Sequence, residues 1–470
     1  MILSFIFFLS LFAGIGLASA RKSRKSKADY YLADQSVAPW LVGLSAVATN
    51  NSGYMFIGVI GYTYTAGLEA IWLMVGWITG DFLASLFVHK KLRSASNQSD
   101  AVTFPALVSS WGGGELKVLR KLLGLAALVF LLSYAAAQLL AGSKALSTLL
   151  EWPAWAGALL GGVLILAYCL AGGIRASIWT DAAQSVVMII AMTILLVVGL
   201  DSVGGFASAF AQMSEIEGYT NLIPDSLAFP GILGLLAFLI GWGVAGFSVI
   251  GQPHIMVRFM TLNNTDNMVK AKSWYYSWFI AFYCAASAVG LLSRILLPDT
   301  QNFDAELALP TIAMELMHPV MVGLVLSAIF AATMSTADSL VLSCSGALSH
   351  DLPNKPAISQ LKIKLITAAV IVSALILALT VKEGVFQLVI FSWSGLGSVF
   401  APLMIARTLQ WQVQENYAIA AVIAGLSACI AWRLAGLHGM VFEGLVGVAL
   451  GLIILRVGHT TKRSSALPST

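Results

Sequence analysis

The chain has 470 residues, of which 59% are hydrophobic and only 10% are charged, and its formal net charge is +4. About a quarter of the residues in a soluble globular protein are charged, so this composition excludes a soluble protein and indicates one that crosses a membrane many times. The basic residues are scattered among short connections and form no domain-sized patch, which excludes nucleic acid as a partner.

Thirteen apolar segments are long enough to cross the hydrocarbon layer of a bilayer. Hydropathy places them, to within a few residues, at 2–20, 38–64, 68–88, 120–146, 154–173, 178–201, 229–250, 274–296, 318–345, 364–381, 385–406, 417–432 and 437–455. No basic residue precedes the first segment, so we interpret it as a retained membrane helix and not as a signal peptide.

An odd number of spans places the two termini on opposite sides of the membrane. If the N-terminus is outside, all but four of the 26 Lys and Arg residues lie on the inner side, the exceptions being Lys144, Arg294, Lys382 and Arg433. Cytoplasmic connections carry an excess of Lys and Arg. We therefore predict a multi-pass protein of the cell (inner) membrane with its N-terminus outside and its C-terminus in the cytoplasm.

Small and amide residues interrupt the second predicted helix, in the stretch Ser45-Ala-Val-Ala-Thr-Asn-Asn-Ser-Gly-Tyr54. Irregular backbone at this depth persists only where protein or a water-filled cavity covers it, so the stretch predicts a broken helix at a binding site. The alternative is structural: small residues let two helices pack closely, and Asn forms a hydrogen bond across the contact.

The segment 229–250 comes five spans after 38–64, and because five is odd, the two groups of five helices run with opposite topology. This is the arrangement of an inverted repeat, in which the first helix of each half is discontinuous and the substrate lies near the midplane. The candidate for the second break is Gly241-Trp-Gly-Val-Ala-Gly-Phe-Ser-Val-Ile-Gly-Gln-Pro-His254.

The predicted fold class is therefore an all-α integral membrane protein of about 13 helices with an inverted repeat of five plus five. Its predicted parts are a first helix with a basic cytoplasmic loop (1–37), a first repeat (38–202), a second repeat (203–407), and two final helices with a short tail (408–470).

A second polar stretch lies in segment 318–345, at Ala331-Ala-Thr-Met-Ser-Thr-Ala-Asp-Ser339. At 3.6 residues per turn Ser335, Asp338 and Ser339 share one face, with Thr336 beside them. Hydroxyls, a carboxylate and freed carbonyls are hard oxygen ligands that suit an alkali cation and not a transition metal. The alternative is that each hydroxyl bonds the carbonyl one turn back, but a membrane-buried aspartate favours a site.

Three further acids lie in apolar segments. Asp181 either belongs to a site or caps the start of its helix, and Asp81 and Glu443 are interpreted as packing or interface residues. All six His lie at predicted helix ends or in loops, so we expect no intramembrane enzyme. The cysteines lack the paired spacing of metal or redox sites and are interpreted as small buried residues: Cys169, Cys284, Cys344 and Cys429.

Six motifs, in order along the chain, give the sequence a family resemblance. They are Asp29-Tyr-Tyr-Leu-Ala-Asp-Gln-Ser36, Leu44-Ser-Ala-Val-Ala-Thr-Asn-Asn-Ser-Gly-Tyr54, Trp179-Thr-Asp181, Gly251-Gln-Pro-His-Ile-Met-Val-Arg-Phe259, Met334-Ser-Thr336 and Trp393-Ser-Gly-Leu-Gly-Ser-Val-Phe-Ala-Pro402. With them the chain resembles the sodium/solute symporters, and within these the bacterial sodium/proline branch. The resemblance implies a LeuT-like fold.

The resemblance also implies two cation sites. One sodium ion would be held by the main-chain carbonyls and hydroxyls of Ala48, Asn51, Ala332, Ser335 and Thr336. Some members hold a second sodium ion through an aspartate at the position of Asp181 and hydroxyls of the ninth helix, and here Asp338 and Ser339 would complete such a site.

Two positions depart from the proline branch. Proline transporters carry an aspartate at the position of Asn50, where sugar-transporting relatives carry Asn, and they carry Trp and Tyr at the positions of Ala245 and Val249. We expect the solute to lie between the two breaks. The predicted solute-binding residues are Asn50, Ser52, Gly53, Tyr54, Trp242, Gly246 and Phe247.

These features predict a secondary active transporter that couples sodium to the uptake of a small organic solute, an amino acid such as proline, by alternating access. The expected partners are the solute, sodium and membrane lipid, with no cofactor beyond sodium as the coupling ion. The alternatives are a sodium symporter for another organic acid or a sugar-like solute, a proton-coupled transporter that uses Asp181 or Asp338, and a solute-sensing membrane module that acts with a partner.

Overall fold

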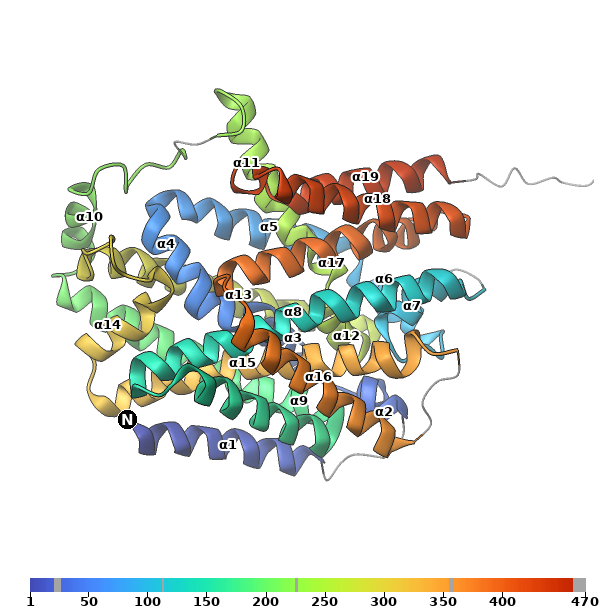
Figure 1. Cartoon of the computed structure of the whole chain (residues 1–470), viewed down its shortest axis with the longest axis horizontal. Coiled ribbons are helices and arrows are strands. Elements are labelled where there is room, and N and C mark those ends of the chain that lie inside the picture. The colour runs from blue at the N-terminus through green and yellow to red at the C-terminus, as the bar shows by residue number, and fades with distance from the viewer. Residues whose placement is uncertain (21–26, 112–113, 225–226, 355–358, 460–470) are drawn as a thin grey trace, which may run out of the picture.

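The computed structural model describes residues 1–20, 27–111, 114–224, 227–354 and 359–459, and over these ranges the chain forms a bundle of helices (Figure 1). An apolar segment in a bilayer has no water to satisfy its backbone groups. An α-helix pairs these groups within the segment, so each apolar segment folds as a helix.

The α-helices are α1 (Ile2–Ala20), α2 (Lys27–Leu32), α3 (Pro39–Gly53), α4 (Ile60–Ala66), α5 (Ile71–Phe87), α6 (His89–Asn97), α7 (Phe104–Ser110), α8 (Lys117–Leu150), α9 (Ala154–Ser202), α10 (Phe206–Ser214), α11 (Ile232–Phe247), α12 (Pro253–Met260), α13 (Met268–Leu296), α14 (Ala308–Leu316), α15 (Pro319–Gly346), α16 (Gln360–Thr380), α17 (Val385–Thr408), α18 (Glu415–Leu434) and α19 (Glu443–Val457). A π-helical turn, η2 (Tyr54–Val59), joins α3 to α4, and a 3-10 turn, η4 (Ser248–Gly251), follows α11.

Each of the thirteen predicted segments falls on a helix, with two differences in detail. The fifth and sixth segments form one element, α9, that bends at Gly173, where φ is 57° and ψ is −148°. The last helix begins at Glu443 and not at 437, because Leu437–Gly439 forms a 3-10 turn after the left-handed Gly436. Nine helices in the described ranges are long and apolar enough to span a membrane, so the count of thirteen crossings stays a prediction.

The prediction of buried cysteines was wrong at one position. Cys284 is exposed, whereas the other three are buried. Ile280, one turn earlier on α13, is also 48% exposed, so both residues lie on the outward face of that helix. Hydropathy alone does not distinguish such a lipid-facing position from a buried one.

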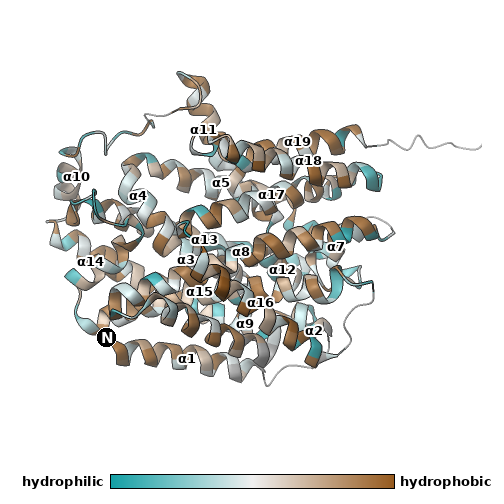
Figure 2. Cartoon of the chain, in the orientation of Figure 1, coloured by the Kyte–Doolittle hydropathy of each residue, from teal (hydrophilic) through white to brown (hydrophobic). Residues whose placement is uncertain are grey.

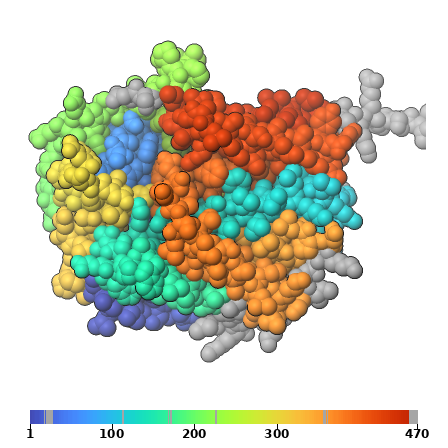
Figure 3. All heavy atoms as spheres, in the orientation of Figure 1, coloured from blue at the N-terminus to red at the C-terminus, as the bar shows by residue number. Residues whose placement is uncertain are grey.

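The connections gather at two ends of the bundle. Figure 1 shows the N-terminus with α10 and α14, from the loops predicted to be outside, at one end, and α2, α6 and α7 at the other. The long helices between them are mostly brown in Figure 2, and hydrophilic teal marks the connecting segments. In the space-filling view α1 and the pair α18 and α19 lie at opposite edges of the face shown (Figure 3).

Two helices of the second predicted repeat form the core. In the most apolar stretch of 18 residues, 89% is buried in α15 and in α17, against 28% in α18. Helix α15 packs against α3, α8 and α9, and α17 packs against α8 and η4. The two discontinuous helices, α3 with α4 and α11 with α12, therefore each face one of the two most buried helices.

Candidate ion and solute site

The first break occurs at Ser52, whose φ of 41° and ψ of −177° end the regular helix. The hydroxyl of Ser52 accepts a hydrogen bond from the N–H of Tyr54 at 3.1 Å. The N–H of Gly53, which the break removes from the helical ladder, donates to Oε1 of Gln138 at 2.8 Å. A Cβ atom on Gly53 would lie 2.6 Å from Cγ2 of Thr333, so this close approach requires glycine.

Helix α8 covers the break with two side chains that the sequence interpretation missed. The hydroxyls of Tyr134 and Ser52 lie 3.2 Å apart, and Gln138 accepts from Gly53 as described above. The amide nitrogen Nε2 of Gln138 is buried and has no hydrogen-bond partner. A glutamine within the apolar segment 120–146 was the signal that could have identified this position.

Helix α15 meets α3 through the hydroxyls predicted to bind sodium. The hydroxyl of Ser335 lies 3.3 Å from the carbonyl oxygen of Ala48 and 3.0 Å from that of Ala332. The hydroxyl of Thr336 donates to the carbonyl of Thr49 at 2.9 Å. Three of the five predicted ligands, Ala48, Ala332 and Ser335, are thus in direct contact. Thr336 is the next residue at the same interface.

The fifth predicted ligand, the carbonyl of Asn51, accepts the N–H of Tyr54 across the break. A neutral set of carbonyl and hydroxyl oxygens suits a hard monovalent cation, because each hydroxyl can turn a lone pair toward the ion. Within the described ranges no group of three or more His, Cys, Asp and Glu side chains could hold a metal ion. The donor chemistry at this interface therefore fits sodium.

The residues predicted to form a second cation site surround an arginine. Nη2 of Arg258, on α12, lies 3.3 Å from Oδ2 of Asp181 and 4.0 Å from Oδ1 of Asp338. The same guanidinium donates to the hydroxyl of Ser177 at 2.7 Å and to that of Ser339. All five side chains are buried. Arg258 was not among the residues predicted for this site, although it stands in the Gly251–Phe259 motif.

This cluster also reaches the first break. The hydroxyl of Ser45 donates to Oδ2 of Asp181 at 2.6 Å, and that of Thr49 lies 3.5 Å from the same oxygen. One guanidinium faces two carboxylates, so the cluster holds one negative charge more than positive when both acids are ionised. An unbalanced charge of this kind is costly in a low-dielectric interior.

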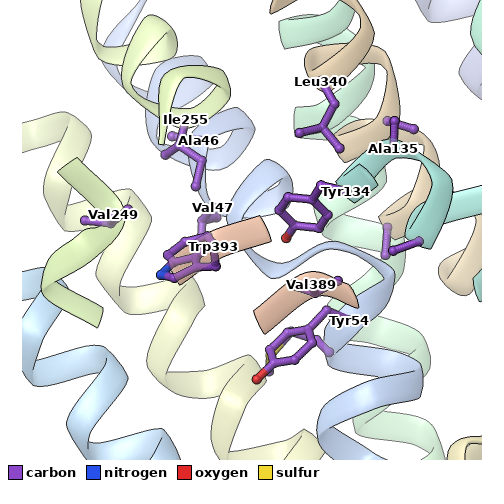
Figure 4. Packing of buried hydrophobic residues seen from close by; sticks show 14 of the residues in the cluster. Ala46, Val47, Tyr54, Tyr134, Ala135, Val249, Ile255, Leu340, Val389 and Trp393 are labelled. Carbon is purple, nitrogen blue, oxygen red and sulfur yellow. The ribbon is translucent and has the colours of Figure 1, made fainter. Parts of the chain in front are cut away.

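Aromatic side chains cover one side of the first break. Tyr54 stacks on Phe386 with a centroid distance of 5.4 Å, and Phe386 stacks on Tyr62 at 5.1 Å. Trp77 packs against Trp393 of α17 at 4.9 Å. Figure 4 shows Tyr54, Tyr134 and Trp393 around the same region, although they come from η2, α8 and α17.

The second break is closed by the same helix α17. The indole N–H of Trp393 donates to the carbonyl of Ala245 at 2.7 Å, and Nε2 of Gln252 donates to the carbonyl of Trp393 at 3.0 Å. Gln252 has φ of −99° and ψ of 100°, so the chain is extended between η4 and α12. The predicted discontinuity of this helix is therefore present, and one tryptophan contacts both of its sides.

The other predicted solute residues lie in three different places. Trp242 lines a cavity described below, and the side chain of Asn50 faces α5 and α13. A Cβ atom on Gly246 would lie 2.0 Å from the carbonyl oxygen of Trp77, and the N–H of Phe247 lies next to Gly80. Gly246 and Phe247 therefore lie against helix α5.

Cavities approach the breaks from both ends of the bundle. One cavity, of about 350 Å³, is lined by Tyr62, Trp242 and Phe386. A second cavity, of about 30 Å³, is lined by Tyr30 and Tyr31 of α2 and reaches Arg258 and Ser339. Phe386 of the first cavity stacks on Tyr54 beside the break, and the Arg258 cluster borders the second cavity.

A sequence profile described as the Sodium:solute symporter family matches residues 30–425 of this chain, which covers both breaks and helix α15. The chain belongs to the sodium:solute symporter family. Its relatives include the high-affinity proline transporter PutP of Bacillus subtilis, which is 29% identical over 92% of this chain and 92% of its own length. They also include the sodium/proline symporter of Escherichia coli, 29% identical over 93% of this chain and 88% of its own length.

Solved structures confirm the fold of this symporter. A substrate-bound, outward-open Na+-coupled sialic acid symporter superposes with a TM-score of 0.77 at 17% identity, covering 97% of this chain and 96% of its own. The nucleobase-cation symporter Mhp1 in a closed conformation superposes with a TM-score of 0.62 at 14% identity, covering 92% and 94%. The symporter is a multi-pass membrane protein with the predicted LeuT-like fold of five plus five helices.

Replacing Ser335 by Ala removes one predicted sodium ligand without adding bulk. We expect the half-saturating sodium concentration for uptake to rise by at least about tenfold, because losing a bond to a charged partner costs about 1.5–3 kcal/mol. Uptake into proteoliposomes at increasing external sodium measures this.

The matched control is Ser327→Ala, about 12 Å away on the same helix, where the hydroxyl donates to the carbonyl of Gly323 at 2.7 Å. It should leave the sodium dependence unchanged. An equal response of the two variants would contradict the assignment of Ser335 to the ion site.

Proposed function

We propose that this symporter carries a small carboxylate-bearing solute, an amino acid such as proline, into the cell with sodium by alternating access. The observation that supports a carboxylate most directly is the N–H of Gly53 at the broken helix, which bonds a neutral amide oxygen, Oε1 of Gln138. Proline as the solute is supported by the names of the relatives, which are proline transporters.

The broken helix is suited to bind a carboxylate. The free N-terminal end of a half-helix carries unpaired N–H groups and a partial positive charge. A carboxylate accepts a hydrogen bond more strongly than an amide oxygen does, so it would displace Oε1 of Gln138 from Gly53. The unpartnered Nε2 of Gln138 could then donate to the second carboxylate oxygen.

Sodium would act by joining the two parts of the protein that meet at the break. The carbonyl of Ala48 belongs to α3. The hydroxyl of Ser335 and the carbonyl of Ala332 belong to α15. An ion shared between these oxygens favours the conformation in which they are close. We infer that this is the outward-open state, in which the solute docks beside Ser52–Tyr54.

The energy available from one sodium ion sets the scale of accumulation. A potential of about 100 mV contributes about 2.3 kcal/mol per charge, and a tenfold sodium gradient adds about 1.4 kcal/mol. The total of about 3.7 kcal/mol supports a solute ratio of a few hundred.

The Arg258 cluster is proposed as a second cation-dependent site. Asp181 and Asp338 supply two carboxylates for one guanidinium, and Ser339 supplies an oxygen. One further monovalent cation would balance the cluster. A second sodium ion and a proton are the two candidates, and they differ in the coupling ratio that a reversal-potential measurement would give.

We further propose that the protein lies in the inner membrane with its N-terminus outside, because this orientation places nearly all Lys and Arg on the cytoplasmic side.

The second candidate solute is another small organic acid. Ala245 and Val249 are both buried beside the second break, and their small side chains leave a different surface from the Trp and Tyr of the proline branch.

Sodium-driven uptake tests the proposed function directly. Proteoliposomes with an inward sodium gradient should accumulate at least one labelled solute from a panel of amino acids and organic acids that includes proline. Vesicles with potassium in place of sodium should not. Equal uptake in both would rule out sodium coupling, and uptake driven by a pH gradient without sodium would support the proton-coupled alternative.

The role of Gln138 is tested by two variants. Gln138→Ala removes Nε2, so we expect the KM for the solute to rise about tenfold with little change in the sodium requirement. Gln138→Glu places a negative charge beside Gly53, so we expect a larger loss because it repels a carboxylate. A Gln138→Glu variant that transports as well as the unmodified protein would contradict a carboxylate at this position.

A further inference from the structure

A buried acid on α5, Asp81, lies outside the ion and solute contacts described so far. Its oxygen Oδ2 accepts a hydrogen bond from the hydroxyl of Tyr275 at 2.6 Å and from Nδ2 of Asn50 at 3.3 Å. Its other oxygen, Oδ1, accepts from the hydroxyl of Tyr276 at 2.8 Å. Three neutral donors from α3 and α13 thus surround one carboxylate that has no exposed surface.

This arrangement differs from an ordinary buried ion pair. Among the described residues no Lys, Arg or His nitrogen lies within 4.0 Å of the Asp81 carboxylate. The facing cation, Lys272 of α13, is half-buried and places Nζ 3.5 Å from the hydroxyl of Ser85, one turn further along α5. Asp81 is therefore held by a complete set of hydrogen bonds and not by a cation, and packing alone does not need such a network.

The network acts on the residue beside the first break. Nδ2 of Asn50 bonds both Asp81 and the hydroxyl of Tyr275, at 3.3 Å and 2.5 Å. Asn50 directly precedes Asn51, whose carbonyl is a predicted sodium ligand, and Ser52, whose φ is 41°. Fixing the Asn50 side chain therefore fixes the last helical turn before the break.

The opposite side of the same turn is held by the other acid cluster. Thr49 and Ser45 face Asp181, with hydroxyl-to-carboxylate distances of 3.5 Å and 2.6 Å. The turn that carries the carbonyls of Ala48 and Asn51 thus lies between two buried carboxylates.

We propose that Asp81 is a positioning residue for the sodium site: its carboxylate holds Asn50, and through Asn50 it sets the helical turn from Ala48 to Asn51 against α15. This inference rests on the proposed function, because it takes the carbonyls of that turn as sodium ligands. A residue needed only for packing would change the amount of folded protein. A positioning residue changes the sodium requirement of the protein that folds.

The test compares solute uptake into proteoliposomes at increasing sodium for three variants. Asp81→Asn keeps the shape and removes the charge, so the half-saturating sodium concentration should rise about tenfold while the rate at saturating sodium stays within about twofold. The double variant Asn50→Asp/Asp81→Asn returns one carboxylate to the network and should recover most of the loss. Glu443→Gln removes a buried membrane acid that pairs with Arg433 at 2.8 Å and should not change the sodium requirement.

Tyr276→Phe provides a variant that keeps the charge if Asp81→Asn does not fold. It removes one donor to Oδ1, and we expect the half-saturating sodium concentration to rise about threefold. Unchanged sodium dependence in Asp81→Asn, or in Tyr276→Phe where Asp81→Asn cannot be purified, would overturn the inference. Sodium-independent uptake by the unmodified protein in the same preparation would instead overturn the proposed function, so the two failures are distinguishable.

Discussion

The interruption of a membrane helix at Ser52 is the constraint on which the other contacts of the site depend. A break frees backbone groups where the bilayer offers no water, so protein must satisfy each of them. Oε1 of Gln138 accepts a hydrogen bond from the N–H of Gly53, and the hydroxyls of Ser335 and Thr336 donate to carbonyls of the preceding turn. The residues that stabilise the break are therefore also the proposed ligands. In the proposed function an ion and a solute would replace these hydrogen bonds.

Charge is arranged around this break in a consistent way. Asp181 lies on one side of the turn and Asp81 on the other, and Arg258 offsets only part of the negative charge. In the proposed function such a site would attract a cation without a carboxylate among its direct ligands. A neutral ligand set also releases its ion more readily than a charged one, which suits a transporter that must unload sodium on every cycle.

The sequence was sufficient for the helices, the inverted repeat and the two breaks, because these follow from hydropathy and from small residues at fixed positions. It also predicted Ser335 and Thr336 as site residues, and in the structure both hydroxyls contact carbonyls of α3. It did not reveal that Asp81 bonds Asn50 or that Arg258 lies among Asp181, Asp338 and Ser339. These contacts join residues far apart in the chain, such as Asp81 and Tyr275. Local periodicity carries no information about contacts over such a separation.

Hydrogen exchange of the purified protein tests the central claim, that sodium closes the broken helix onto α15. Backbone amides in peptides covering 45–54 and 331–339 should exchange more slowly in sodium than in potassium, because the ion holds the carbonyls and hydroxyls of both stretches together. Peptides from the peripheral helix α18 should exchange equally in both salts. Equal exchange at 45–54 and 331–339 in sodium and potassium would contradict the account.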